Sequence, residues 1–257
     1  MMSFDYSIHY KRFHDESETH AIAMAEWLGI YLKEYLPDDR DLGVLDVGCG
    51  FGFAMRAMRD AGFADVRGIE LSEHQATIAR SGGFEVQVVA DTSEYLEKNP
   101  SRFGVILLLD VLEHVPVAAQ IGLLRAIRQA LRADGRLILT VPNANSPLAA
   151  RWRYIDFTHC ASFTEHSLFF VLSNAGFGTI QMDNSTGIGK FPRRWWQKGC
   201  REALRKWIVR YVWSQVFKAE LHARENLDEI CFELNLKAVA INDCTQPERK
   251  PDGQALA

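Results

Sequence analysis

The chain has 257 residues, of which 47% are hydrophobic and 24% are charged, and its formal net charge is −4. This composition is typical of a globular protein, and the length suits one α/β domain with an appendage. The acidic total argues against a general nucleic-acid-binding protein. The charge is uneven, however, because residues 1–189 carry a net −8 and residues 190–224 carry a net +8.

Cysteine usage and the N-terminal sequence predict a cytoplasmic protein. The cysteines show no spacing that would bind zinc, so we expect free thiols in a reducing compartment. They are Cys49, Cys160, Cys200, Cys231 and Cys244. The N-terminal sequence lacks the apolar core of a secretory signal, and no apolar run approaches the ~20 residues of a membrane-spanning helix.

Strands and helices are predicted to alternate over the first half of the chain. A helix is expected over residues 17–36, capped by Ser17 or Thr19. The alternation that follows is typical of βαβ units and predicts a parallel sheet. The expected strands are 43–47, 65–70, 85–89, 103–109 and 136–141, and the expected helices are 52–62, 73–81 and 117–132.

The pattern changes after Pro142. The expected elements are a long loop over 142–163, a helix over 165–175, a strand over 177–182, a basic tryptophan-rich stretch over 190–222 and a terminal strand over 229–241. The predicted organisation is an N-terminal helical cap (1–42), a domain over 43–243 with a helical insertion at 190–224, and a disordered tail (244–257).

A glycine-rich turn directly follows the first predicted strand. The run DVGCGFG (46–52) has glycines at alternate positions, where the backbone can turn tightly and approach a ligand closely. A ligand there would lie at the positive N-terminal end of the next helix. Glu70 ends the second predicted strand, where α/β nucleotide sites place a carboxylate for ribose hydroxyls.

The same run indicates which nucleoside binds. Phe53 stands where a dinucleotide fingerprint has its third glycine, which disfavours a nicotinamide-dependent reductase. The run DVGCGFG instead resembles the first motif of class I S-adenosylmethionine-dependent methyltransferases, whose cofactor carries no phosphate. Later stretches resemble the further motifs of this family in order. They are GIELSEHQATIAR (68–80), ADT (90–92), LLLDVLEHV (107–115) and LRADGRLILTVPN (131–143).

This resemblance implies a Rossmann-like methyltransferase fold with a mostly parallel seven-stranded sheet, and S-adenosylmethionine as the cofactor. It implies that the glycine loop holds the methionine moiety, that Glu70 binds the ribose, and that Asp91 contacts the adenine amino group. The cofactor-binding residues it implies are Asp46, Gly48, Cys49, Gly50, Gly52, Glu70, Leu71, Asp91, Thr92, Asp110 and Val111.

Methyl transfer to a hydroxyl requires a base near the methyl group, because the oxygen must lose its proton as the carbon–oxygen bond forms. His114 and His159 follow the fourth and fifth predicted strands, and an unperturbed histidine pKa of ~6.5 suits this role. We expect His159 to be the base, Asp156 to orient it, and His114 to support it. A purely structural hydrogen-bonding role is the alternative for both histidines.

The stretch 142–177 resembles a bacterial methyltransferase subgroup whose genes often lie among glycan-assembly genes. The segments that carry this resemblance include RYIDFTH (153–159) and FTEHSL (163–168). It implies an O-methyltransferase acting on a sugar hydroxyl of a glycan or a lipid-linked saccharide. Two alternatives stay open. One is a small phenol or quinone precursor as acceptor, and the other is a non-catalytic, cofactor-binding partner subunit.

Asp110, Glu113 and His114 also resemble a constellation in ubiquinone-pathway O-methyltransferases, where acids and a histidine can hold a divalent cation. Such oxygen-rich ligands would suit Mg²⁺. No cysteine or histidine pair has the spacing of a transition-metal site, so we expect no tightly bound transition metal.

The basic stretch over 190–222 is amphipathic on a helical projection. Basic residues share one face: Arg194, Lys198, Arg201 and Arg205. The opposite face carries Trp196, Cys200, Ala203, Trp207 and Tyr211. We expect a helix packed on the domain with its basic face in water, with peripheral contact at the inner membrane face as the alternative. The negative remainder of the chain disfavours RNA.

Overall fold

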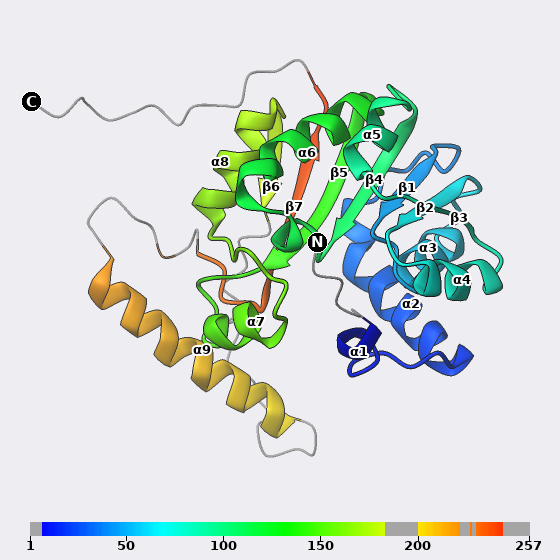
Figure 1. The fold of residues 1–257 in the computed structure, drawn as a ribbon. Helices are drawn as coiled ribbons and strands as arrows, with labels where there is room; N and C mark the ends of the chain where they lie inside the picture. Colours follow the sequence, from blue (N-terminus) through cyan, green and yellow to red (C-terminus); the bar gives the residue numbers. More distant parts are fainter. Residues whose placement is uncertain (1–6, 183–199, 222–226, 228–229, 244–257) are drawn as a thin grey trace, which may run out of the picture.

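The structure, a computed structural model, describes residues 7–182, 200–221, 227 and 230–243. Within these residues one seven-stranded sheet has the order β3-β2-β1-β4-β5-β7-β6 (Figure 1). Neighbouring strands are parallel except at β7, which runs antiparallel to both β5 and β6. The Rossmann-like, mostly parallel seven-stranded sheet is therefore confirmed.

The strands at the centre of the sheet are buried on both faces, as continuous apolar sequence predicts. In β4 every residue from Phe103 to Leu108 is buried. The strands are β1 (Val44–Val47), β2 (Val66–Glu70), β3 (Glu85–Val88), β4 (Phe103–Leu109), β5 (Leu131–Pro142), β6 (Thr179–Met182) and β7 (Asn235–Ile241).

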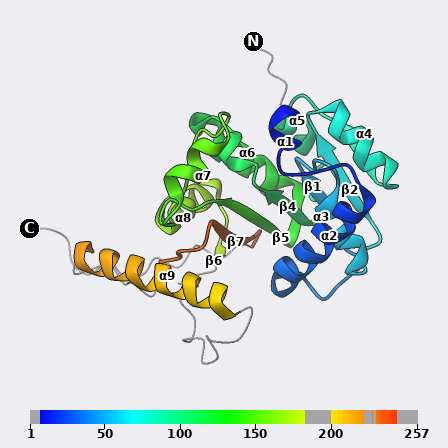
Figure 2. The same ribbon diagram turned by 90° about the horizontal axis from the view of Figure 1, so that it is seen from below.

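Helices cover both faces of the sheet (Figures 1 and 2). One apolar core lies under α2 (Glu18–Leu32), α3 (Phe53–Asp60) and α4 (Glu73–Ser81). The other lies under α5 (Thr92–Glu97), α6 (Val117–Ala130) and α8 (Glu165–Ala175). The remaining helical elements are α1 (Ser7–Tyr10), the 3₁₀ turns η1 (Lys33–Tyr35) and η2 (Leu112–His114), α7 (Ala149–Ile155) and α9 (Cys200–Glu220).

Hydrogen bonds hold the C-terminal end of α2, and the 3₁₀ turn η1 that follows it, against the sheet. Lys237 Nζ donates to the carbonyl of Tyr31 at 3.2 Å, and Arg136 donates to the carbonyl of Tyr35 at 3.0 Å. Cations near the last carbonyls of a helix are favourable because that end carries a partial negative charge. This contact fixes α2 beside the C-terminal strand, where both elements border the cavity described below.

Most predicted elements are present, and β4, α4 and α8 have the predicted bounds. The expected loop over 142–163 was wrong in part, because it contains α7. That helix has only seven residues and buries none of them fully. β5 begins at Leu131, which pairs with Phe103 ahead of a shift in register.

Some predictions lie outside the described residues. They concern the tail over 244–257 and the parts of the predicted insertion at 190–199 and 222–224. None of the helices in the described ranges is long and apolar enough to cross a membrane.

Candidate cofactor and acceptor sites

Glycines shape the loop between β1 and α3. Gly48, Gly50 and Gly52 have φ values of 72°, 54° and 84°, in the left-handed region that other residues rarely adopt. A Cβ on Gly48 would lie 2.8 Å from the side chain of Val111, and a Cβ on Gly50 would collide with the hydroxyl of Tyr10. The loop therefore requires glycine, and it leads its backbone to the positive N-terminal end of α3.

Glu70 ends β2, and three backbone N–H groups hold its carboxylate. Oε2 accepts from Gly50 at 2.9 Å, while Oε1 accepts from Leu71 at 2.8 Å and from Ser72 at 2.9 Å. The residue is only 9% exposed. Because two carboxylate oxygens offer about four lone-pair sites, Glu70 retains one, on Oε2, for a hydroxyl of a ribose.

One cavity of about 1480 Å³ joins this loop to the loops after β4 and β5. Pockets for a single small ligand usually measure ~300–1,000 Å³, so this cavity has room for a cofactor and an acceptor side by side. It lies beyond the carboxyl ends of the strands, where ligands of open α/β sheets bind.

The charge of the cavity wall suits a cationic cofactor. Among the described residues that line the cavity, Lys237 is the one lysine or arginine. Burial, with a smaller contribution from Glu70, raises the pKa of Asp46 to about 7. A sulfonium or ammonium group bound here would stabilise the charged form of the carboxylates that line the cavity. The acidic residues of the wall are Asp46, Glu70, Asp110, Glu113, Asp156 and Glu233.

The structure brings most predicted cofactor residues to this cavity but not all of them. The predicted residues that line it are Asp46, Gly48, Cys49, Gly50, Glu70, Leu71, Thr92, Asp110 and Val111. Gly52 and Asp91 are not among them. Asp91 Oδ1 instead accepts from the N–H groups of Ser93 and Glu94 and caps α5, a position that aspartate favours.

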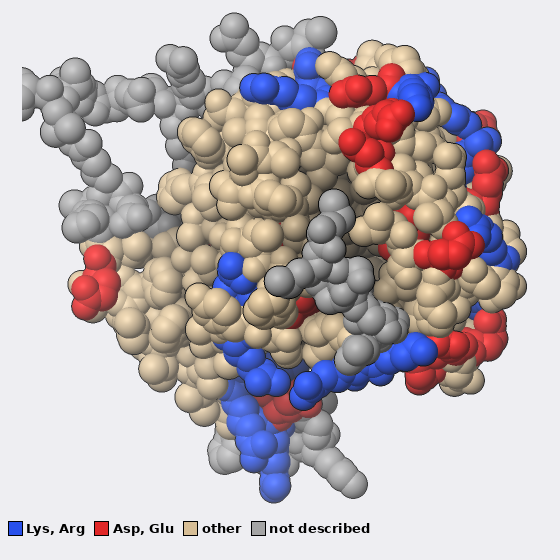
Figure 3. Space-filling model, in the orientation of Figure 1, with Lys and Arg blue, Asp and Glu red and all other residues tan. Residues whose placement is uncertain are grey.

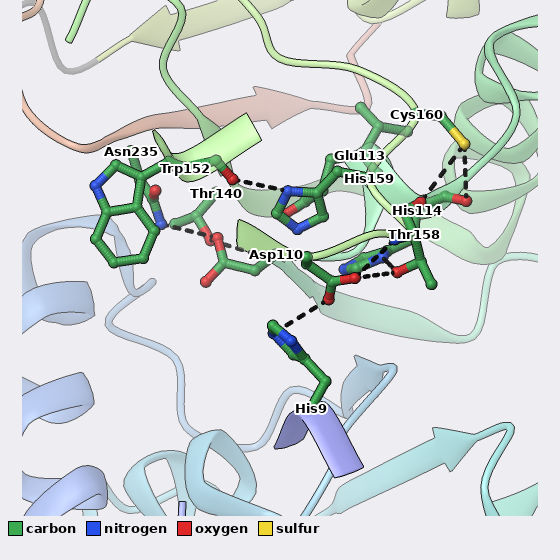
Figure 4. A network of polar contacts seen from close by, with 12 residues as sticks. His9, Asp110, Glu113, His114, Thr140, Trp152, Thr158, His159, Cys160 and Asn235 are labelled. Carbon is green, nitrogen blue, oxygen red and sulfur yellow. Dashed lines mark hydrogen bonds and ion pairs between the residues drawn. The ribbon is translucent and has the colours of Figure 1, made fainter. Parts of the chain in front are cut away.

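Asp110, directly after β4, is held in an unusual backbone conformation. Its φ is 53°, which is uncommon for a residue with a side chain and recurs at functional sites. Its Oδ1 accepts from Thr140 Oγ1 and from Asn235 Nδ2, both at 2.9 Å (Figure 4). These contacts to β5 and β7 fix Asp110 at the centre of the cavity wall.

His159 has a defined tautomer. Its Nδ1 lies 3.0 Å from the carbonyl oxygen of Trp152 (Figure 4). Because a carbonyl can only accept, Nδ1 carries the proton, and the neutral ring has its lone pair on Nε2. Burial lowers the pKa of His159 below its usual value, an effect that the charge of Asp156 partly opposes. The ring is therefore neutral at neutral pH, and Nε2 can accept a proton.

Thr158 links His114 to Asp156. Thr158 Oγ1 donates to Asp156 Oδ1 at 2.7 Å and accepts from His114 Nδ1 at 2.7 Å. The rings of His114 and His159 meet edge to face, with centroids 4.7 Å apart. Burial, and next the neighbouring His159, lower the pKa of His114 to about 4. Two neutral imidazoles thus lie together at the acceptor end of the cavity.

Asp156 has several partners in the structure, and its expected role of orienting His159 stays a prediction. Its carboxylate orients His114 through Thr158, whereas the ring of His159 is oriented by the carbonyl of Trp152. Asp156 Oδ2 also pairs with His9 of α1 at 3.3 Å. The main chain between Asp156 and His159 forms a turn, in which the N–H group of His159 donates to the carbonyl of Asp156 at 3.4 Å. Thr158, which stands between them in the sequence, was not predicted.

Glu113 completes this cluster. It is 1% exposed, and its Oε1 lies 4.0 Å from His159 Nε2. Its other oxygen, Oε2, is buried and has no hydrogen-bond partner among the described residues. Burial raises the pKa of Glu113 well above its usual value. The ligand atoms of Glu113, His114 and His159 lie within 4.8 Å of one another, so these three residues could hold a metal ion.

We nevertheless expect no metal requirement, because the two histidines are already oriented as neutral bases without one. Turnover should survive treatment with a chelator, and calorimetric titration with Mg²⁺ or Zn²⁺ should give the same weak signal for the natural protein and for Glu113→Gln. Loss of turnover on chelation that Mg²⁺ or Zn²⁺ restores would contradict this expectation, and tight binding that Glu113→Gln abolishes would place the ion in this cluster.

Curated relatives match part of this chain in sequence. A ubiquinone biosynthesis O-methyltransferase of Pseudomonas paraeruginosa is 37% identical over 107 residues, which are 40% of this chain and 45% of the relative. Its counterpart in Aliivibrio fischeri is 32% identical over the same length, or 44% of that relative. The match therefore spans less than half the length of these relatives.

Solved structures share the fold. An S-adenosylmethionine-dependent methyltransferase from Archaeoglobus fulgidus superimposes with a TM-score of 0.61 at 20% identity, covering 84% of this chain and 94% of that one. A phosphoethanolamine N-methyltransferase of Haemonchus contortus in complex with S-adenosyl-L-methionine has a TM-score of 0.57 at 17% identity, covering 96% and 61%.

The methyltransferase-domain family model matches residues 23–182, a range that contains the glycine loop, Glu70, His114 and His159. This match covers more than half of the chain, and the sheet order, the glycine loop and the acidic cavity agree with it. The chain belongs to the methyltransferase-domain family, as a class I S-adenosylmethionine-dependent methyltransferase.

Proposed function

We propose that the protein transfers a methyl group to a hydroxyl oxygen, and that the acceptor is a sugar hydroxyl of a glycan or of a lipid-linked saccharide. The observation that carries O-methylation is the pair of neutral imidazoles, His114 and His159, beside the buried Glu113 in the same cavity as the glycine loop. A sugar hydroxyl is a weak nucleophile and needs a positioned base, which this cluster supplies.

Cofactor binding and proton removal take place at opposite ends of the cavity in this proposal. The glycine loop and Glu70 position the cofactor, and when bound, S-adenosylmethionine supplies the methyl group as the electrophile. At the other end, His159 Nε2 takes the acceptor's proton, while the carbonyl of Trp152 keeps the ring in the required tautomer. Holding base and acceptor in one closed geometry removes much of the entropic cost of the reaction.

A small phenol or quinone precursor is the second candidate acceptor. The relatives described above are ubiquinone biosynthesis O-methyltransferases, which supports it. The cavity also has an aromatic wall on α2, where Trp27 and Tyr31 stack with ring centroids 4.9 Å apart. Either a planar ring or the apolar face of a sugar could pack on such a wall. The two candidates differ in acidity, and a phenol depends less on the base.

Cofactor binding tests the first half of this proposal. Glu70→Ala should weaken binding of S-adenosylmethionine and of its demethylated product by about ten- to a hundredfold, because a charged acceptor of a ribose hydroxyl bond is lost at a cost of ~1.5–3 kcal/mol. Isothermal titration calorimetry on both proteins measures this. Glu73→Ala, an exposed acid three residues away, is the matched control. Equal affinities for Glu70→Ala and the natural protein would remove Glu70 from the site.

Single substitutions test the base. His159→Ala should lower kcat by at least ~10²-fold with unchanged cofactor affinity, because a positioned base contributes ~10²–10⁴-fold in rate. His114→Ala should cost less. Turnover assays with saccharide and with phenolic acceptors provide the measurement. Loss of activity in His114→Ala alone would reverse the two roles, and cofactor binding without turnover of any acceptor would favour the non-catalytic subunit.

The pH dependence of kcat tests the electrostatics of the same histidine. The pKa of His159 is lowered, so its lone pair is available at neutral pH and is lost only as the pH falls below 6.5. Because Asp156 raises this pKa, Asp156→Asn should move the acid limb of kcat to still lower pH. An acid limb above pH 6.5, or one that Asp156→Asn shifts upward, would contradict this assignment.

A further inference from the structure

The helix α9 packs against the outside of the cavity wall. Trp213 Nε1 donates to the carbonyl of Asn145 at 2.8 Å, and the rings of Phe217 and Phe232 meet with centroids 5.0 Å apart. Arg210 forms an ion pair with Glu233, which itself lines the cavity. One face of α9 therefore packs against the segment that precedes β7 (Figure 1). This segment borders the acceptor end of the cavity.

The opposite face of α9 is apolar and exposed. Ile208, Val212 and Val216 recur at intervals of four residues and so lie in one row. Together with Val209 they are between 46% and 56% exposed. An apolar row along one helix is unusual at a surface that meets only water.

Two arginines extend this row toward the N-terminal end of α9. Arg201 and Arg205 are exposed and lie on the same face, one and two turns before Ile208. Across Cys200–Glu220 the sequence has five lysines and arginines but only two glutamates. Figure 3 shows blue side chains gathered at the lower end of the molecule, where α9 begins. The outer face thus combines aliphatic side chains with cations.

This arrangement differs from the helical projection of the sequence. The projection placed Trp207 and Tyr211 on one face as partners of the domain or of a membrane. In the structure these two rings stack on each other with centroids 5.1 Å apart, and Tyr211 is 45% exposed. Trp213 and Phe217 provide the contacts with the domain instead. The aliphatic row faces outward, and Tyr211 beside it is exposed to a similar extent.

We propose that this outer face of α9, formed by Arg201, Arg205, Ile208, Val212 and Val216, docks the protein on an anionic lipid bilayer. The arginines match the negative headgroups, and the aliphatic row enters the boundary between headgroups and acyl chains. Pairing of α9 with α9 of a second copy fits less well, because the acids that α9 itself could offer the arginines are only Glu202 and Glu220, and Glu202 already pairs with Lys206.

Docking through α9 would bring the acceptor end of the cavity close to the membrane surface, because the inner face of the same helix holds the cavity wall. An acceptor carried by a membrane lipid could then reach His159 without leaving the bilayer. This consequence rests on the proposed function, whereas the docking itself does not, since it requires neither cofactor nor acceptor.

Vesicle co-sedimentation of the full chain tests the proposal without cofactor or acceptor. The natural protein should bind vesicles of phosphatidylcholine with phosphatidylglycerol and bind vesicles of phosphatidylcholine alone far less. The double variant Arg201→Ser and Arg205→Ser should partition ~30-fold more weakly. Val212→Asp should partition at least ~10-fold more weakly, because it places a charge in the apolar row.

Ile30→Asp is the matched control, since Ile30 is an exposed aliphatic residue on α2, 78% exposed and outside the cavity lining. It should bind vesicles as the natural protein does, and all variants should keep their affinity for the demethylated cofactor, which shows that they fold. Equal binding to both kinds of vesicle, or binding that neither α9 variant reduces, would overturn the proposal. So would a dimer that Val212→Asp converts to a monomer in a protein that does not bind vesicles.

Discussion

The carboxylate of Glu70 joins the two loops on which the cofactor site depends. It accepts one N–H group from the glycine loop after β1 and two from the turn after β2. The ends of two parallel strands are thereby held at a fixed separation by one side chain. The positive φ of Gly50 is needed for the same contact, because the loop must turn its N–H group toward Glu70. The glycine motif and the acid 20 residues later are therefore one structural unit.

The acceptor end is built differently, because it depends on contacts between loops rather than on a strand end. A chain of hydrogen bonds runs from His114 through Thr158 to Asp156, and Asp156 meets His9 of α1. Such outer partners fix the tautomer of an imidazole and so decide which nitrogen can accept a proton. Burial lowers the pKa of both histidines, which makes them bases rather than cations at neutral pH.

The sequence predicted the cofactor end of the site better than the acceptor end. Periodicity and glycine placement located β1, β2 and the loop at Gly48–Gly52, because local backbone geometry determines them. The partner of His159 could not be predicted, since the ring is held by the main-chain carbonyl of Trp152, and no side-chain pattern indicates such a contact. Asp91 caps α5 in the structure, and its contact with the adenine stays a prediction. An aspartate after a strand can serve a ligand or cap the next helix, and the sequence alone does not separate the two roles.

The N-terminal helix α1 connects the two ends of the cavity. Tyr10 lies over Gly50 and packs on Phe51, so it touches the cofactor loop, whereas His9, one residue earlier, pairs with Asp156 of the acceptor loop. A helix of four residues has little apolar surface of its own, and contacts with site residues therefore determine much of its position. It follows that the orientation of Asp156, and through Thr158 that of His114, is linked to the cofactor loop through neighbouring residues of one short helix.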